Sequence, residues 1–466
     1  MSVQQPGVSD AFPHLPAGAW LAYYGDDFTG STDVMDAFAH AGIPTVLFLR
    51  TPDARWIERF AHMRCVGLAG TARGHSPAWM REHLPAAFAS LRAFGAPLLQ
   101  YKVCSTFDSS PDSGSIGQAI DLGLAAMGGT WSPMVIGAPR LRRYQAFGHL
   151  FAAMGETVHR LDRHPTMSRH PVTPMPESDL RRHLAHQTSR RLELIDLVTL
   201  HSGRGNEALA RLQDGAEPPV VLLDVVDDQT LAEAGRVVWE GRGQGLFSAS
   251  SSGLEYALVA HWRRTGALGA GALLPQTQPA ASLVAVSGSC SPVTAAQIAW
   301  AQRNGFSTER LVVDRLLDAR AAEAEVARVV AQAVRALEDG LQPLIYSASG
   351  PDDPHVQQFP AAASHAGIAL PQAHALVGRA LARCMQQVIA HTGVRRVAIA
   401  GGDSSGAVAS ALDITALTVL SQLAPGAPLC RAWSDVPAMD GLEVVLKGGQ
   451  MGAEDFFGRV LNGTVA

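Results

Sequence analysis

Hydrophobic and polar positions change along the chain in a pattern that predicts strands and helices in turn. Short apolar runs bounded by turn residues predict buried strands, and longer segments with apolar residues every three or four positions predict helices. In the first half the predicted strands are 20–24, 45–49, 65–69, 98–103, 134–136, 192–200 and 220–225. Predicted helices between them include 31–41 and 77–94. This alternation is typical of an open α/β sheet.

A second alternation follows a segment that lacks periodicity. Residues 266–281 are rich in Gly, Ala and Pro, which predicts a linker. Beyond it, strands are predicted at 283–288, 397–400 and 444–446, with an amphipathic helix at 319–338. We therefore predict two open α/β domains with mostly parallel sheets and a cleft between them. The predicted parts are a disordered leader 1–18, an N-terminal domain 19–270, a linker 271–281 and a C-terminal domain 282–466.

The composition excludes several classes of protein. A chain of 466 residues that is 47% hydrophobic is expected to be globular, and its net charge of −5 does not suit a nucleic-acid binder. The sequence contains no run that resembles a transmembrane helix, so no membrane partner is expected. Its five cysteines are widely spaced and never form a C-x-x-C pair. That usage fits the cytoplasm and excludes the common zinc patterns.

Two glycine-rich loops in the C-terminal half indicate a nucleotide site. The first, Gly401-Gly402-Asp403-Ser404-Ser405-Gly406, follows an apolar strand and precedes an alanine-rich segment that is predicted to be helical from residue 407 onward. The second, Lys447-Gly448-Gly449-Gln450-Met451-Gly452, also follows an apolar strand. Glycine lets backbone N–H groups approach a phosphate closely, and a helix start adds its positive dipole end. A tight turn that binds nothing is the alternative, and it is less attractive for two such loops.

In the N-terminal half, an acidic segment follows the first strand: Tyr24-Gly25-Asp26-Asp27-Phe28-Thr29-Gly30-Ser31-Thr32-Asp33. Ligands of open α/β sheets gather at the carboxyl ends of strands. Because neighbouring strand residues point to opposite faces, both aspartates can meet one ligand only if the chain turns between them. One is expected to face a substrate hydroxyl and the other to hold the loop. The alternative is an Asp-rich turn with an N-cap.

Two further strand ends carry groups suited to a small hydroxylated acid. Lys102-Val103-Cys104-Ser105-Thr106-Phe107-Asp108-Ser109-Ser110 combines one cation with four hydroxyls. The ammonium can meet a carboxylate and the hydroxyls can recognise alcohols. Arg140, after a later strand, could clamp a carboxylate with two hydrogen bonds. A plain polar loop and an exposed surface arginine are the respective alternatives.

One motif points to a different class of enzyme. Gly203-Arg204-Gly205-Asn206-Glu207-Ala208 fits the dinucleotide-binding pattern, and Asp224 closes the next predicted strand where a ribose-binding acid is expected. The motif is short and lies late in its domain, so we favour a turn followed by a helix start.

Taken together, the motifs resemble the four-carbon acid sugar kinase family. The matching segments occur in family order over nearly the whole chain: 25–30, Lys102 with Ser105-Thr106, Pro174-Met175, 177–180, 287–291, 401–406, and Lys447-Gly448 with 455–457. The resemblance implies an N-terminal sugar-acid-binding domain, a C-terminal nucleotide-binding domain and phosphorylation of a small sugar acid by ATP. It also implies a homodimer, from the family tendency.

The resemblance assigns residues to both ligands. Those expected to touch ATP are Ser289, Ser291, Gly401, Gly402, Asp403, Ser404 and Gly448. Those expected to face the sugar acid are Asp26, Asp27, Thr29, Gly30, Lys102, Ser105, Thr106 and Arg140. Many members carry an Arg-Gly pair where this chain has Phe107-Asp108. That departure leaves open a branched or oxidised relative, such as an oxo-isoapionate, beside threonate, erythronate and oxo-tetronate.

We therefore expect transfer of the ATP γ-phosphoryl group, with Mg²⁺ as the ATP complex, to a primary hydroxyl of the acid. Asp27 is the first candidate for the base that takes the hydroxyl proton, and Asp26 is the second. No metal-ligating residues are assigned. Two alternatives stay open, an NAD-linked oxidoreductase that uses residues 203–208 and a sugar-acid sensor without turnover.

Overall fold

The structure is a computed structural model that describes residues 12, 14–170, 172–215, 217–269, 277–401, 403–424 and 426–464. The chain divides into two compact units, Met1–Val46 with Thr51–Leu273, and Leu47–Arg50 with Leu274–Ala466. Residues 1–11 and 13 of the predicted leader lie outside the described residues, as do residues 271–276 of the predicted linker. The domain limits given from sequence, and the cleft, stay predictions.

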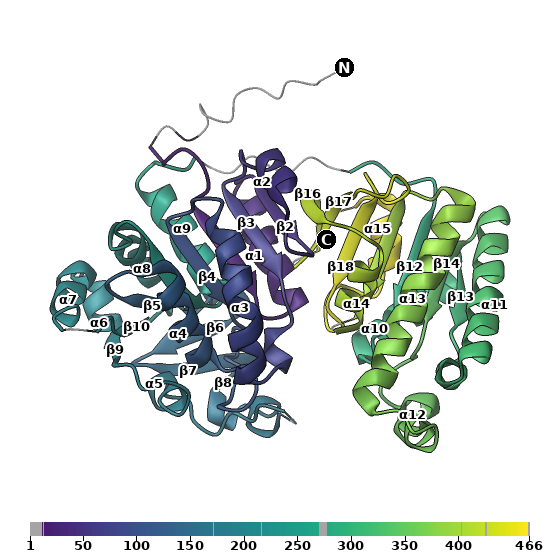
Figure 1. Cartoon of the computed structure of the whole chain (residues 1–466), viewed down its shortest axis with the longest axis horizontal. Coiled ribbons are helices and arrows are strands. Elements are labelled where there is room, and N and C mark those ends of the chain that lie inside the picture. Colours follow the sequence, from purple (N-terminus) through teal and green to yellow (C-terminus); the bar gives the residue numbers. More distant parts are fainter. Residues whose placement is uncertain are drawn as a thin grey trace. The chain divides into compact units, whose positions relative to one another are not determined.

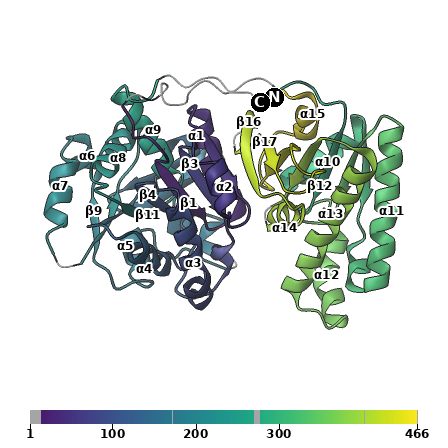
Figure 2. The same ribbon diagram turned by 45° about the horizontal axis from the view of Figure 1, so that its top comes forward.

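The first unit alternates strands with helices, as Figures 1 and 2 show. Its strands are β1 Leu21–Gly25, β2 Thr45–Phe48, β3 Cys65–Ala69, β4 Leu98–Lys102, β5 Ser132–Met134, β6 Arg143–Ala146, β7 His149–Met154, β8 Thr157–Arg160, β9 Leu192–Ile195, β10 Val220–Leu223 and β11 Leu246–Ser250. Strand β2 is described with this unit, although its last two residues fall in the second. Its helices are α1 Phe28–His40, α2 Ala54–Arg59, α3 Pro77–Arg92, α4 Ile116–Met127, α5 Leu180–Leu184, α6 Leu197–His201, α7 Gly205–Leu212, α8 Asp228–Glu240 and α9 Gly253–Arg264.

The second unit repeats the alternation. Its strands are β12 Leu283–Ser287, β13 Phe306–Arg310, β14 Gln342–Tyr346, β15 Arg396–Ala400, β16 Ala416–Ala424, β17 Ala427–Trp433 and β18 Glu443–Lys447. Its helices are α10 Pro292–Arg303, α11 Ala319–Glu338, α12 Pro354–His365, α13 Leu370–Thr392, α14 Asp403–Ala411 and α15 Phe456–Asn462. The predicted fold class, mixed α/β with mostly parallel strands in two parts, is confirmed. None of the described helices is long and apolar enough to cross a bilayer.

Both units share one strand order around their first strand. In the first unit the main sheet runs β11-β4-β1-β3-β2, and in the second the corresponding strands run β15-β12-β14-β13. In each unit the chain visits the edge strand and its inner neighbour, and then crosses to the other side of the first strand. That crossing creates a topological switch point, where open α/β sheets bind ligands beyond the carboxyl ends of their strands. No sequence repeat announces this correspondence.

Helices cover the strands on two sides within each unit (Figure 1). In the first unit α3 and α4 pack against each other and both contact β4. Helices α1 and α9 pack against each other as a second pair. In the second unit α11 packs beside α13, and α10 packs beside α15. The central strands β1, β4, β12 and β15 are buried at every residue, including the polar Gln100 and Lys102 of β4.

Several predicted elements differ from the observed ones in extent, and three of them are informative. The strand predicted at 192–200 ends at Ile195, because the Asp196 carboxylate accepts a hydrogen bond from the Thr199 backbone N–H and starts α6. The strand predicted at 134–136 is β5, which instead covers Ser132–Met134. The helix predicted from residue 407 onward begins at Asp403, so that residues 403–406 form its first turn.

Asp224, the acid that a dinucleotide site would use to bind a ribose, is bound by other parts of the protein. Gly203 has a left-handed φ of +69° and α7 begins at Gly205, so the dinucleotide-like motif is a turn followed by a helix. The Asp224 carboxylate is buried and accepts hydrogen bonds from the backbone N–H groups of Phe147, Gly148 and Leu197 and from the Gln145 amide. Because the Asp224 carboxylate already accepts four hydrogen bonds from the protein, it is not available to bind a ribose, which disfavours the oxidoreductase alternative.

Candidate functional site

The carboxyl ends of three parallel strands lie level at the switch point of the first unit. In the sheet register, Gly25 at the end of β1 pairs with Ala69 at the end of β3 and with Lys102 at the end of β4. The residues that follow these ends therefore gather at one edge of the sheet. They include Asp26 and Asp27 after β1, and Arg73 shortly after β3.

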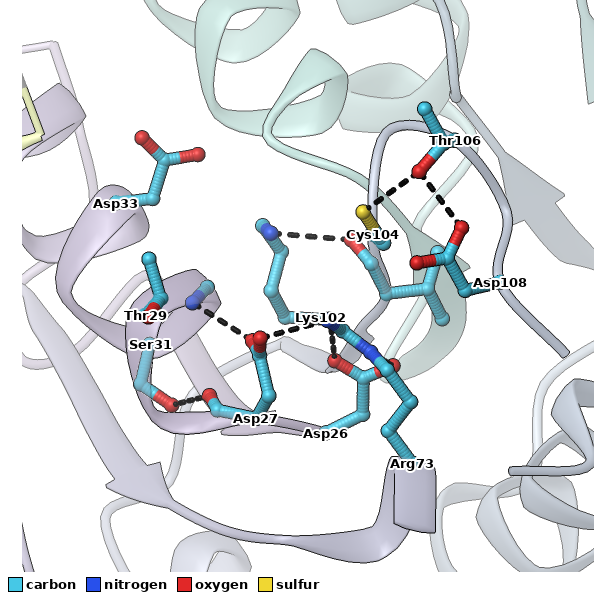
Figure 3. Close-up of polar contacts among 12 residues, drawn as sticks. Asp26, Asp27, Thr29, Ser31, Asp33, Arg73, Lys102, Cys104, Thr106 and Asp108 are labelled. Carbon is cyan, nitrogen blue, oxygen red and sulfur yellow. Dashed lines mark hydrogen bonds and ion pairs between the residues drawn. The ribbon is translucent and has the colours of Figure 1, made fainter. Parts of the chain in front are cut away.

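Two adjacent carboxylates share the Arg73 guanidinium (Figure 3). Its Nη2 and Nε donate to the two carboxylate oxygens of Asp26 at 2.6 and 3.2 Å, and its Nη1 donates to Asp27 Oδ2 at 2.6 Å. The chain turns after Gly25, so both side chains face the same cation although they are sequence neighbours. The backbone fixes the arrangement, because Asp26 N donates to Lys102 O and Arg73 N donates to Asp26 O, each at 3.0 Å.

Asp27 also begins helix α1. Its Oδ1 accepts a hydrogen bond from the Gly30 backbone N–H at 2.7 Å, as an N-cap does. Gly30 leaves room for two neighbours, since a Cβ at this position would lie 2.5 Å from Asp27 Oδ1 and 3.1 Å from Lys102 Nζ. The lack of a side chain at Gly30 lets the ammonium and the carboxylate approach the start of the helix together.

Lys102 brings an uncommitted cation to this edge. Its residue is only 2% exposed, and within the part of the chain that the structure describes its ammonium donates one hydrogen bond, to Val103 O at 3.0 Å. A buried ammonium has three hydrogens to donate. The remaining donors, beside the bare Cα of Gly30, are suited to an anionic group of a ligand.

Burial changes the acidity of this cluster. It raises the pKa of Asp26 to about 6, although the Arg73 guanidinium opposes the rise. Asp27 is the more accessible carboxylate, with 26% of its side chain exposed against 2% for Asp26. Burial also raises the pKa of the Cys104 thiol to about 11, so Cys104 is no thiolate nucleophile near neutral pH. In the described ranges, no three His, Cys, Asp or Glu side chains form a group that could hold a metal ion.

The other predicted sugar-acid residues differ in how they are held. Thr106 Oγ1 donates to Asp108 at 2.7 Å and contacts Cys104 Sγ at 2.9 Å (Figure 3). The structure gives Ser105 no hydrogen bond within its described part. Phe107, in the segment that departs from the family pattern, is fully buried with a left-handed φ of +61°. In this conformation the Phe107 ring is buried, and the next residue, Asp108, accepts the hydrogen bond from the Thr106 hydroxyl.

Arg140 and Thr29 complete that set. The Arg140 guanidinium lies 5.9 Å from the ring centre of Tyr256 in α9, and its residue is exposed. Thr29 lies in the first turn of α1, where its carbonyl accepts a hydrogen bond from the Thr32 hydroxyl. The structure brings Asp26, Asp27, Gly30 and Lys102 into direct contact and places Arg140 beside a different helix of the same unit.

A second cluster forms at the switch point of the C-terminal unit. There the ends of β12, β15 and β18 lie level, because Ser287 pairs with Ala400 and Ala400 pairs with Lys447. Lys447 turns inward. Its ammonium donates to the carbonyl oxygens of Gly448 and Met451 at 3.0 and 3.2 Å and to Thr294 Oγ1 at 3.1 Å. Burial lowers its pKa to about 8.

Lys447 and Gln297 donate to the carbonyl groups of the glycine loop, whereas three of its backbone amides have no acceptor in the described part of the chain. Gln297 Nε2 donates to the carbonyl oxygens of residues 451–453 at 3.0–3.1 Å. The backbone N–H groups of Gly448, Gly449 and Gln450 meet no acceptor among the residues that the structure describes. Successive unpaired amides in a glycine loop form a site for an anion such as a phosphate.

The remaining predicted nucleotide residues adjoin this loop to different degrees. Ser289 is buried, and a Cβ at Gly449 would lie 2.6 Å from its Oγ. Ser291 caps α10 by accepting a hydrogen bond from Val293 N. Gly401 has a φ of +147°, and its N–H donates to Lys447 O at 3.0 Å. Gly402 lies outside the described residues, and Asp403 and Ser404 are described only as backbone in the first turn of α14.

Sequence reasoning did not find Arg73 or the role of Lys447. A signal for Arg73 was present, since it lies four residues after the end of β3, and parallel strands end at a common edge. Lys102 and Lys447 are also the only lysines of the chain. Both stand at the ends of strands at the two switch points, where a compact charge can be enclosed by backbone carbonyls.

Two family models match the chain, one to each unit. A sugar-binding N-terminal domain matches residues 21–258, and a nucleotide-binding C-terminal domain matches residues 284–457. The chain is 60% identical to the 3-oxo-isoapionate kinase of Paraburkholderia graminis, over 97% of this chain and 96% of the relative. It is 31% identical to the 3-oxo-tetronate kinase of Cupriavidus necator, over 95% and 96% of the two chains.

The fold also matches a solved structure. A protein of Salmonella typhimurium LT2, 26% identical in sequence, superposes with a TM-score of 0.76 over 94% of this chain and 98% of that chain. The likeness covers both units.

The enclosed lysine generates a prediction for nucleotide binding. The substitution Lys447→Met keeps much of the side-chain volume but removes the ammonium that donates to the carbonyls of Gly448 and Met451. The loop then loses its fixed shape, and we expect the Kd for ATP to rise at least about tenfold, the effect of losing one charge-assisted contact. Calorimetric titration measures this, with Arg335→Met on α11 as the control. An unchanged Kd for ATP would show that Lys447 does not shape the site.

Proposed function

The chain belongs to the four-carbon acid sugar kinase family, and we propose that it transfers the γ-phosphoryl group of ATP to a primary hydroxyl of 3-oxo-isoapionate, a branched and oxidised sugar acid. The observation that carries the acceptor class is the buried, uncommitted Lys102 ammonium beside the Asp27 carboxylate. A sugar acid has a group for each, because its carboxylate is an acceptor for Lys102 and its hydroxyl is a donor for Asp27.

Lys102 would hold the acid by its carboxylate. A charge-assisted hydrogen bond from a buried ammonium is stronger and shorter than one between neutral groups. Ser105 and Thr106, on the loop that follows Lys102, would contact the hydroxyls. Thr106 already donates to Asp108, so its oxygen is left to accept. Arg140 would bind from the side of α9.

Asp27 would orient the acceptor hydroxyl and take its proton. Of the two aspartates it is the more exposed, whereas both oxygens of Asp26 are paired with Arg73. Each Asp27 oxygen accepts one hydrogen bond and keeps a second lone pair. Phosphoryl transfer passes through a loose transition state, so a base already stabilised by Arg73 is sufficient. Asp26 would hold Arg73 in place.

The C-terminal unit would bind the phosphates. The unpaired amides of residues 448–450 supply hydrogen-bond donors of the kind that phosphates require, and the first turn of α14 adds a helix N-terminus at the neighbouring strand. Ser289 would add a hydroxyl. When bound with ATP, Mg²⁺ would neutralise charge on the phosphates. No side chain is assigned to the metal.

The substrate choice within the family rests on identity and on one loop. The chain is 60% identical to a 3-oxo-isoapionate kinase and about half as identical to a 3-oxo-tetronate kinase over nearly the same length. The loop after Lys102 carries Phe107-Asp108, with Phe107 in a left-handed conformation. Because this loop follows Lys102 and differs from the family pattern, it suits an acceptor that differs from a straight four-carbon chain.

We also propose that the enzyme works in the cytoplasm and forms a homodimer. All five cysteines are free, and they lie apart in the sequence, which fits a reducing compartment. The homodimer rests on the family tendency. Nucleic acid and membranes have no role in the proposal.

The substrate proposal predicts the outcome of an ADP-release assay. With Mg-ATP, we expect the kcat/KM for 3-oxo-isoapionate to exceed that for 3-oxo-tetronate, threonate and erythronate by at least about tenfold, because a substrate group that fills a built site discriminates by that much or more. In the matched variant Asp27→Asn, turnover should be lost while the melting temperature stays near that of the wild type.

Two results would count against the proposal. Equal kcat/KM values for the branched and the unbranched acids would remove the choice of substrate. Full activity of Asp27→Asn would remove the assignment of the base.

The shared guanidinium predicts a shift in the pH dependence. Because Arg73 lowers the pKa of Asp26, the substitution Arg73→Gln should raise that pKa above about 6, so that protonation begins at higher pH. The acidic fall of kcat/KM should then move upward by about one pH unit, and kcat should fall about 100-fold because two carboxylates lose their partner. Activity measured from pH 5 to pH 8 tests this, with the exposed Arg81→Gln as the control. A fall at the same pH as in the wild type would separate Arg73 from the reaction.

A further inference from the structure

A carboxyl group lies enclosed behind the sugar-acid site. Glu255 is in the first turn of α9 and is 0% exposed. Neither of its carboxyl oxygens meets a donor with full hydrogen-bond geometry in the described part of the chain, and the neighbouring Gln100 side chain compensates only in part. A buried, unpaired carboxylate is costly, and such a group usually neutralises itself by keeping its proton. Burial raises the pKa of Glu255 to about 8, and the nearby Lys102 charge only partly opposes the rise.

The elements packed around Glu255 bring the following groups to it. Strand β4 contributes Lys102 and Gln100, helix α1 contributes Asp33, and strand β3 contributes Cys65. On α9 itself the neighbour is Tyr256. Lys102 is the only cation of this set, and no ion pair between it and Glu255 is present among the described residues.

Gln100 connects Glu255 to the framework of the site. Its amide donates to the carbonyl oxygens of Ser250 and Ser251 at 3.2 Å, and so links β4 to the end of β11. In the sheet register, Ser250 pairs with Lys102. Gln100 thus joins the strand that carries Lys102 to the segment that leads into α9, where Glu255 lies.

An ionised Glu255 would add a negative charge to a site that already holds several carboxyl groups. Arg73 and Lys102 are its cations, and Asp26, Asp27 and Asp33 are its other acidic side chains. An ionised Glu255 would therefore compete for Lys102. An acid that approaches with its own carboxylate would then meet a cation that is already neutralised.

We propose that Glu255 is a positioning residue that keeps its proton in the active enzyme and thereby leaves the charge of Lys102 for the carboxylate of the sugar acid. The proposal rests on the proposed function of Lys102. When the proton is lost to solvent, the O–H bond of the carboxyl breaks, a carboxylate remains beside Lys102, and affinity for the acid falls. Glu255 touches neither substrate; it acts through Lys102.

The test is the pH dependence of sugar-acid use in the wild type and in Glu255→Gln. Glutamine has the same shape and cannot ionise. At saturating Mg-ATP, we expect the wild-type KM for the acid to rise about tenfold per pH unit above pH 8, with a smaller change in kcat. The variant should match the wild type within about threefold at pH 7 and keep its KM up to pH 9. The exposed Glu82→Gln, which carries the same charge change, should follow the wild type.

Lys447 also titrates near pH 8, in the other unit. Saturating nucleotide removes its effect on nucleotide binding, and comparison of the variant with the wild type at each pH cancels what remains. An alkaline rise of KM that is identical in Glu255→Gln and in the wild type would overturn the proposal. So would loss of activity in the variant at pH 7 with its fold intact.

Stability provides a second readout that does not need turnover. Between pH 4.5 and pH 8 the unfolded chain releases the Glu255 proton and the folded chain retains it, so this group lowers wild-type stability as the pH rises. Glu255→Gln should therefore raise the melting temperature, and more at pH 8 than at pH 5. If Glu255→Gln raised the melting temperature by the same amount at pH 5 and at pH 8, or at neither pH, the proposal would be contradicted.

The infrared spectrum separates the two levels of the account. A protonated, buried carboxyl gives its own C=O stretching band, which should be present at pH 7 in the wild type and absent in Glu255→Gln. If the band is present but no sugar acid binds at any pH, the proposed function fails while the protonation of Glu255 stands. If the band is missing, the further inference fails on its own.

Discussion

The proposed sugar-acid site depends on one guanidinium that pairs with two adjacent carboxylates. Asp26 and Asp27 are sequence neighbours, and without a shared cation two carboxylates this close would repel each other. Arg73 contacts both, at 2.6 Å to each. The pairing is secured by backbone hydrogen bonds that join the ends of β1 and β4 and the turn after β3. Any movement of one strand end would therefore displace the carboxylates and Lys102 together.

The same arrangement of strands underlies both proposed ligand sites. Each unit reverses its strand order beside its first strand, and each places a single lysine at the end of a strand there. The two lysines use their hydrogen-bond donors differently. The Lys102 ammonium keeps donors available beside Gly30. The Lys447 ammonium donates to carbonyl groups of the glycine loop, so that backbone amides of the loop can meet a ligand. In one unit a side-chain cation would meet the ligand, and in the other the backbone would.

Much of the fold could be predicted from the sequence, because buried parallel strands are short apolar runs. The fold class and the family are confirmed, and helix α11 begins and ends at the predicted residues. The prediction failed where a side chain overrides an apolar run: Asp196 caps a helix inside a segment predicted to be a strand. The residues assigned to the two ligands stay predictions, although four of those assigned to the acid contact one another. Arg73 and Glu255 were missed because their significance lies in contacts made across the fold, between segments distant in sequence.

The central claim is that Lys102 receives the carboxylate of the sugar acid. With only two lysines in the chain, protein labelled with ¹³C at lysine Cε should show one NMR signal for each, assigned with Lys447→Met. The account predicts that 3-oxo-isoapionate shifts the Lys102 signal and leaves the Lys447 signal in place. Binding of the acid, shown by calorimetry, without any shift of the Lys102 signal would contradict it.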